Sequence, residues 1–209
     1  MLTYHLNQSA APANEPLTTA QAKLHLNIET AETFFDAYLD DLVKVARELV
    51  ETETGLQLIT ATWELYLPRF PQGRERLYIP IGPVLSITNI DYPDTAGVAA
   101  TINVTTGIQK TIHESPAYLT PAYDASWPAV RQLVDGVKIT FTAGHGSTLS
   151  SNARAEHLVR LLVAHWFRHR EPAAEKTFNQ IPLTARRLID QLRLPDEFHA
   201  YGEPSVHKN

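Results

Sequence analysis

The sequence contains no cysteine. This absence excludes a disulfide scaffold, a thiolate zinc site, an iron–sulfur cluster and a cysteine nucleophile. No apolar run approaches the roughly 20 residues that cross a bilayer, and the longest run, Leu161 to Phe167, is interrupted by His165. The first residues lack the basic start and apolar core of a signal peptide. We therefore expect a soluble globular protein with no membrane partner.

A basic excess is also missing, since 18 Lys and Arg residues face 23 Asp and Glu residues, for a net charge of −5. This balance argues against a general nucleic-acid binder. The charge is uneven along the chain. Residues 1–56 hold nine acidic and three basic residues, whereas residues 150–209 hold nine basic and seven acidic residues. Opposite charges at the two ends can attract each other within one chain or between copies.

The first block, residues 1–56, is predicted to be helical. Thr18 begins a capping-box pattern, which opens a short helix that ends near Asn27. Thr30 is the expected N-cap of a longer helix over residues 31–53. At 100° per residue, the apolar residues of this longer helix fall on one half and its charged residues on the other.

The second block, residues 57–149, changes to a period of two. Residues 60–67 and 137–142 alternate apolar and polar side chains, which is typical of half-buried strands. Further short strands are expected at residues 77–81, 84–91, 100–104 and 109–113. Five or six short strands at close spacing predict a small antiparallel β-sandwich or barrel.

The third block, residues 150–193, returns to helical periodicity. A helix over residues 152–170 is so apolar that we expect it at the centre of a bundle or buried by another subunit. A last helix is expected at residues 184–193, and residues 194–209 read as a tail. The predicted fold class is α+β: a helical bundle from both ends of the chain, with the β unit inserted between them.

Two patterns could carry chemistry. His165 and His169 have the i,i+4 spacing of helical metal ligands, but no third ligand is evident, and packed histidines are the favoured reading. Aromatic side chains of the strand block could form a stacking platform for sugars, although such residues usually fill the core. They are Trp63, Tyr66, Tyr78, Tyr92, Tyr118, Tyr123 and Trp127. The alternatives left open are a tail or baseplate component with a glycan-binding β unit and a histidine-based metal hydrolase. We expect no enzyme activity and no cofactor.

Several stretches, in order along residues 15–193, resemble one protein family. They are Glu15–Lys23, Ala46-Arg47 with Thr54-Gly55, Thr62–Leu65, Pro83–Ile87, Ser126-Trp127-Pro128, Val137–Gly146, Leu161–Phe167 and Ile181-Pro182. In these stretches the chain resembles the head–tail connector proteins, also called adaptors or head-completion proteins, of long-tailed bacteriophages and gene transfer agents.

The resemblance implies a structural virion protein at the head–tail junction, assembled in the host cytoplasm. Such proteins form a ring, usually of twelve copies, which binds the portal, extends the DNA channel and receives the next tail-side stopper protein. Double-stranded DNA would pass through without specific binding. The resemblance implies portal contacts by the tail, at Leu194, Phe198, Tyr201 and Val206. Channel-lining or subunit-interface residues are expected at Asp36, Asp40, Arg186 and Arg187.

Overall fold

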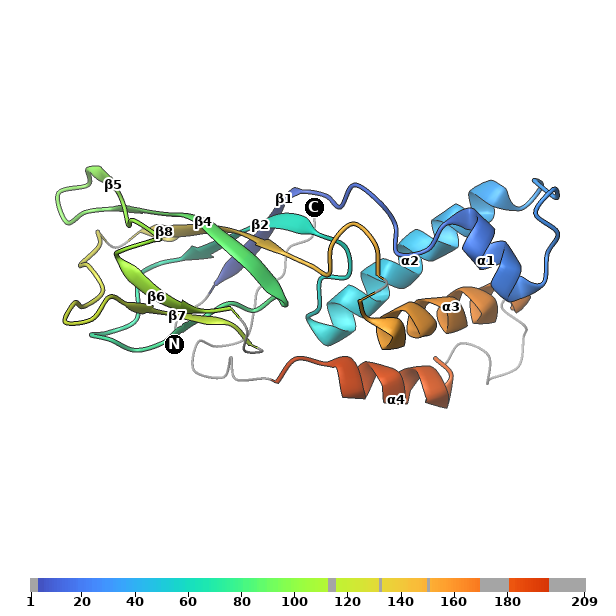
Figure 1. Cartoon of the computed structure of the whole chain (residues 1–209). Helices are drawn as coiled ribbons and strands as arrows, with labels where there is room; N and C mark the ends of the chain where they lie inside the picture. Colours follow the sequence, from blue (N-terminus) through green and yellow to red (C-terminus); the bar gives the residue numbers. More distant parts are fainter. Residues whose placement is uncertain (1–3, 113–115, 132, 150, 170–180, 196–209) are drawn as a thin grey trace. The chain divides into compact units, whose positions relative to one another are not determined.

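The computed structural model describes residues 4–112, 116–131, 133–149, 151–169 and 181–195. These residues form four helices and eight strands, which divide into two compact units (Figure 1). The helical unit consists of residues 13–59 and 145–193, and the β unit of residues 4–12 and 60–144 with residues 194 and 195. The protein is therefore of the predicted α+β class. Within the described ranges, no helix is long and apolar enough to cross a membrane.

The first helix, α1 (Thr19–Leu26), begins at the predicted capping box. The Thr18 hydroxyl accepts the Gln21 backbone N–H at 3.2 Å, and the Gln21 side chain accepts the Thr18 N–H at 2.8 Å. These two bonds satisfy backbone donors that no helical carbonyl can reach. Asn27 ends the helix in the left-handed conformation, at φ 59°.

The second helix, α2 (Asp36–Thr54), begins later than the sequence pattern predicts. Thr30 is not its N-cap, because Phe35 holds that position. The Glu32 carboxylate accepts the Phe34 N–H at 2.9 Å, a local bond that favours a turn over helix. The Thr30 carbonyl accepts a hydrogen bond from Lys23 Nζ at 3.2 Å, so a contact from α1 also holds this turn.

The helices α3 (Ala153–Arg168) and α4 (Leu183–Leu192) complete the helical unit. Asn152 caps α3, since its side-chain oxygen accepts the Ala155 N–H at 3.2 Å. α3 packs against each of the other three helices. The core of this packing is apolar and fully buried: Leu39, Val43, Ala46 and Val50 from α2, and Leu158, Val159, Leu162 and Val163 from α3. Leu161 and Trp166 remain half-buried, so the described chain covers only part of the apolar arc of α3.

The β unit contains two antiparallel sheets that share one hydrophobic core. The five-stranded sheet has the order β1 (His5–Ala10), β2 (Ala61–Leu67), β8 (Val137–Ala143), β4 (Val84–Pro93) and β5 (Ala99–Thr101). The three-stranded sheet has the order β3 (Leu77–Tyr78), β7 (Tyr118–Pro121) and β6 (Ile108–Thr111). β8 shows the expected period of two, because Val137, Ile139, Phe141 and Ala143 are buried and alternate with half-buried residues.

Two strands were not predicted. β1 lies within the block read as helical, and it pairs antiparallel with β2, with Leu6 opposite Leu65. Its sequence is mostly polar, so only the pairing with β2 and the burial of the preceding Tyr4 reveal it. β7 is four residues long and ends at Pro121, which gives too short an alternation to identify from the sequence.

Candidate assembly surfaces

Asp36 and Asp40 connect α2 to α1. Asp36 Oδ1 lies 2.5 Å from Nζ of Lys23, a residue that is only 3% exposed. Asp40 Oδ1 accepts a hydrogen bond from the Thr19 hydroxyl at 2.6 Å. Asp36 is half-buried and Asp40 is exposed. Asp36 therefore neutralises a buried lysine, whereas Asp40 keeps a face toward solvent.

A second ion cluster joins the C-terminal half of α2 to residues before α1 and after α2. Arg47 is 6% exposed. Its Nε donates to Glu15 at 2.7 Å and its Nη1 to Glu51 at 2.9 Å. The Glu51 carboxylate also accepts the Gln57 side-chain amide at 2.7 Å and the Leu58 N–H at 3.0 Å. Burial raises the pKa of the Glu51 carboxyl, and Arg47 acts in the opposite direction.

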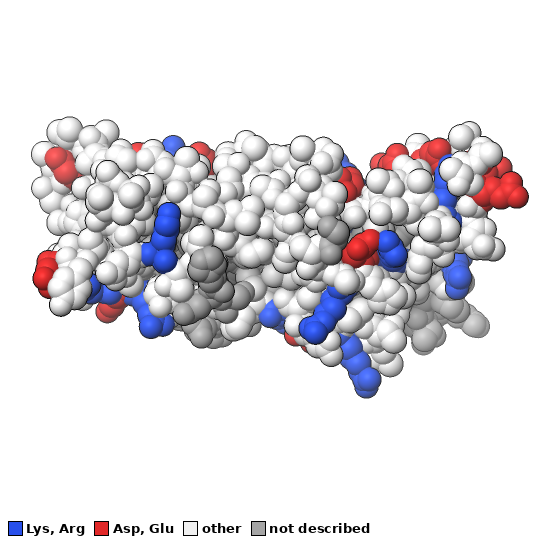
Figure 2. Space-filling view, viewed as in Figure 1, with Lys and Arg blue, Asp and Glu red and all other residues white. Residues whose placement is uncertain are grey.

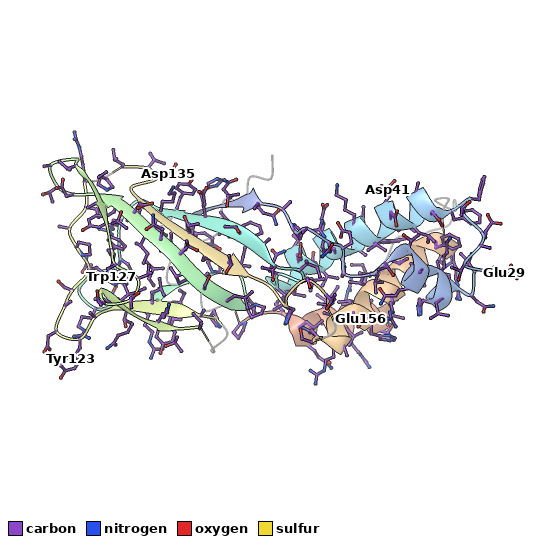
Figure 3. The ribbon with its side chains drawn as sticks, turned by 45° about the horizontal axis from the view of Figure 1, so that its top comes forward. Glu29, Asp41, Tyr123, Trp127, Asp135 and Glu156 are labelled. Carbon is purple, nitrogen blue, oxygen red and sulfur yellow. The ribbon has the colours of Figure 1, made fainter. Side chains whose placement is uncertain are left out.

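The exposed side of α2 carries what we call the acidic stripe: Asp41, Val45 and Glu48. All three are exposed, Val45 to 52%, and exposed Lys44 lies on the same side between Asp41 and Glu48. At 100° per residue they lie opposite the buried residues Leu39 and Val43. Figure 3 shows Asp41 on α2 and Glu156 on α3 on opposite sides of the helical unit. The acidic stripe therefore faces away from α3.

The outward side of α3 carries what we call the basic stripe: Arg154, His157, Leu161 and Arg168. Leu161 is half-buried and the other three are exposed. At 100° per residue the mean direction of the stripe lies about 140° from that of the buried residues of α3, and Arg154 lies at its edge, near Leu158. In the view of Figure 2, most red atoms of the helical unit lie along its upper edge with a blue side chain among them, and the lowest blue atoms lie over α4.

His25 from α1 extends the basic stripe. Its pKa is lowered by partial burial and by the positive charges of Arg160, His157 and Arg168. Arg160 is paired with Glu156 one turn earlier on α3. The sequence analysis found a basic excess in residues 150–209 but did not assign His25 or His157 to a basic surface. The i,i+3 and i,i+4 spacing of Arg154, His157 and Leu161 was the signal that could have identified the stripe.

Arg186 and Arg187 lie exposed on α4, whose buried residues are Ala185 and Ile189. Within the described ranges neither arginine forms an ion pair. Leu194 is half-buried. The other predicted portal contacts, Phe198, Tyr201 and Val206, lie outside the described residues.

Two groups of side chains within the described residues bear on the two alternatives, a histidine-based metal hydrolase and a glycan-binding β unit. The rings of His165 and His169 lie 4.9 Å apart, but no group of three or more metal-binding side chains occurs in the residues that the structure describes. Trp127 is 7% exposed and stacks on Phe70 at 4.9 Å, so it belongs to the core rather than to a sugar platform. Tyr123 is 79% exposed.

No protein-family model and no curated protein matches this sequence. The structure, however, is similar to chains in solved neck assemblies. One is from the neck of an empty GTA particle computed with C6 symmetry. It is 26% identical, has a TM-score of 0.72, and the match covers 90% of this chain and 95% of that chain. Another is from the neck of a native GTA particle computed with C12 symmetry. It is 25% identical, has a TM-score of 0.66, and the match covers 90% of this chain and 94% of that chain.

A third is from the virion of a native gene transfer agent (GTA) particle. It is 24% identical, has a TM-score of 0.71, covers 90% of this chain and 95% of that chain, and shows the fold alone. Because each likeness covers nine-tenths of this chain, it includes residues of both the helical unit and the β unit.

Proposed function

We propose that this chain is a structural protein of the head–tail neck of a phage-like particle. The observation that carries the proposal is the likeness to neck chains of gene transfer agent particles over 90% of the sequence, at 25–26% identity. In this proposal the protein acts in the virion, after assembly in the host cytoplasm. It is an architectural component, with no catalytic step and no cofactor.

We infer further that the protein forms a ring adaptor, with twelve copies as the expected number. The sixfold and twelvefold symmetry of the similar necks supports a ring of identical chains. In a ring each contact is heterologous, so one face of a subunit meets a different face of its neighbour. Exposed Asp40 on α2 and exposed Arg186 and Arg187 on α4 provide oppositely charged surfaces for such contacts.

The finer architecture in this proposal is a helical bundle and an inserted β-sandwich. The mutual packing of the four helices and the core shared by the two sheets support it. Double-stranded DNA passes through the ring without specific binding. The net charge of −5 supports this, because acidic surfaces repel phosphates.

The proposed partners are the portal on one side and a tail-side stopper protein on the other. Electron microscopy of the purified protein mixed with its cognate portal tests the proposal. We expect the protein alone to be monomeric or weakly associated and to form a ring on the narrow end of the portal. A tight, salt-independent dimer that leaves portals undecorated would contradict the ring.

The tail beyond Pro195 is the proposed portal-docking element, with Leu194 at its base. We expect deletion of residues 195–209 to leave the melting temperature nearly unchanged and to abolish or weaken portal co-sedimentation. Replacement of both Phe198 and Tyr201 by Ala should reproduce most of this loss, because aromatic anchors carry much of an interface's energy. Full portal affinity in the truncated protein would move the contact to another surface.

A further inference from the structure

We propose that the acidic stripe of one copy docks on the basic stripe of the next copy in the ring. The proposal deepens the ring assembly proposed above and rests on it. Asp41 and Glu48 of one subunit would face Arg154, His157 and Arg168 of its neighbour. The predicted interface residues Asp36 and Asp40 are not the centre of this contact, because Asp36 already neutralises Lys23 and Asp40 binds Thr19.

The placement of the stripes suits a ring. α2 and α3 pack through buried apolar residues, and each stripe lies on the far side of its own helix from that packing. The two stripes therefore lie on opposite sides of the α2–α3 pair. A copy that offers one stripe to the neighbour before it can offer the other to the neighbour after it. This is the heterologous contact from which closed rings are built.

The charges in the stripes remain available for a partner. In the described part of the chain, Asp41, Arg154 and Arg168 form no ion pair. Glu48 Oε1 lies 3.6 Å from Nη2 of Arg47, a long contact to a guanidinium that binds Glu15 and Glu51 more closely. Docking of the stripes would neutralise charges that the isolated subunit leaves exposed to solvent.

The charged residues span different lengths along the two helices. With a rise of 1.5 Å per residue, Asp41 and Glu48 lie about 10 Å apart along α2, with Val45 between them. His157 and Arg168 lie about 16 Å apart along α3, with Leu161 between them. The long side chain of Arg168 can close the difference, so charge can meet charge at both ends of a central apolar contact.

The apolar residues favour a protein over DNA as the occupant of the basic stripe. Val45 is 52% exposed in the acidic stripe, and Leu161 is half-buried in the basic stripe. A phosphate backbone would meet the arginines but offers no apolar partner for Leu161. The acidic stripe of a second copy offers both carboxylates and Val45.

Charge reversal tests the contact. We would prepare Asp41→Arg, Arg168→Glu and the double variant, and measure portal-templated ring formation by sedimentation and electron microscopy. Each single reversal should raise the concentration for half-maximal ring formation about tenfold, because an attraction becomes a repulsion. The double variant should return close to the wild-type value, since opposite charges again meet at every interface.

Matched reversals serve as controls. Asp135→Arg, two residues before β8, and Lys110→Glu on β6 change exposed residues of the β unit outside both stripes and should leave ring formation unchanged. If wild-type protein forms no ring on the portal, the proposed function fails. If wild-type rings form and both single reversals assemble normally, or the double variant remains defective, the stripe contact is wrong while the ring adaptor stands.

A DNA-binding measurement tests whether duplex DNA, rather than a second copy, binds the basic stripe. We expect weak binding of duplex DNA by wild-type protein at low salt, and the same weak binding by Arg168→Glu. A large loss of DNA binding in Arg168→Glu, together with normal ring formation, would assign the basic stripe to DNA and overturn the proposal.

Discussion

Replacement of Arg47 by Met should destabilise the protein through the carboxylates that it leaves behind. The methionine can fill the space of the arginine stem, so the change removes the charge and its hydrogen bonds more than the packing. Arg47 lies in contact with Glu15 and Glu51, whose side chains are 35% and 13% exposed. Most of the cost should come from Glu51, because Glu15 retains more contact with water.

The size of the effect follows from this geometry. Removal of one partner from a buried ion pair costs about 3–5 kcal/mol, and we take about 3 because both carboxylates keep some exposure. For a chain of this length, that corresponds to a fall in melting temperature of about 6–12 °C. Circular dichroism at 222 nm follows the helices and provides the assay.

A double variant isolates the charge effect. In Arg47→Met with Glu51→Gln, the glutamine oxygen can still accept from the Gln57 amide and the Leu58 N–H. The more buried of the two carboxylates is then uncharged, so the double variant should be more stable than Arg47→Met alone, by about 1–2 kcal/mol. Equal losses in the single and the double variant would refute the reasoning.

The pH dependence provides a second check. Burial raises the pKa of Glu51 above its ordinary value of 4.5, and the loss of Arg47 should raise it further. A raised carboxyl pKa means that the cost of ionisation is absent below pH 4.5 and grows as the pH rises through the folded-state pKa. The deficit of Arg47→Met relative to wild type should therefore be smaller at pH 4.5 than at pH 7.5.

Three further predictions concern single residues. Leu162 is fully buried, so Leu162→Asp should unfold the helical unit at the cost of several kcal/mol, and an unchanged melting temperature would contradict its core position. Asp36→Asn should lower the free energy of unfolding by about 1–3 kcal/mol, because it leaves the buried Lys23 ammonium without a counter-charge. Asp40→Asn, at an exposed site, should lower it less in the same thermal unfolding measurement. Equal losses would count against the Lys23–Asp36 ion pair. Burial lowers the pKa of His145, so its contribution to stability is present above pH 6.5 and is lost as the pH falls through the folded-state pKa. The drop in melting temperature between pH 7.5 and pH 5.5 should therefore shrink in His145→Gln, and an equal drop would assign the acid sensitivity to other groups.

The sequence by itself determined the features that depend on neighbours along the chain. The capping box at Thr18, the end of α2 one residue beyond the predicted residue 53 and the period of two in β8 are local patterns, and the structure has each of them. The α+β class follows from the same periodicities. Such features are predictable because backbone hydrogen bonds and side-chain periodicity act over only a few residues.

Only the tertiary structure decided the features that depend on residues far apart in sequence. Lys23 donates a hydrogen bond to the Thr30 carbonyl, and α2 begins later than its amphipathic pattern predicts. Lys23 also forms an ion pair with Asp36, so a carboxylate that was expected at an assembly surface has its partner within the subunit. β1 is a strand because β2 is available to pair with it. The two stripes lie on opposite sides of the α2–α3 pair because the buried face of each helix is chosen by its partner. A charge pattern along one helix fixes which residues share a face, but the packing of that helix decides which face remains for a neighbour.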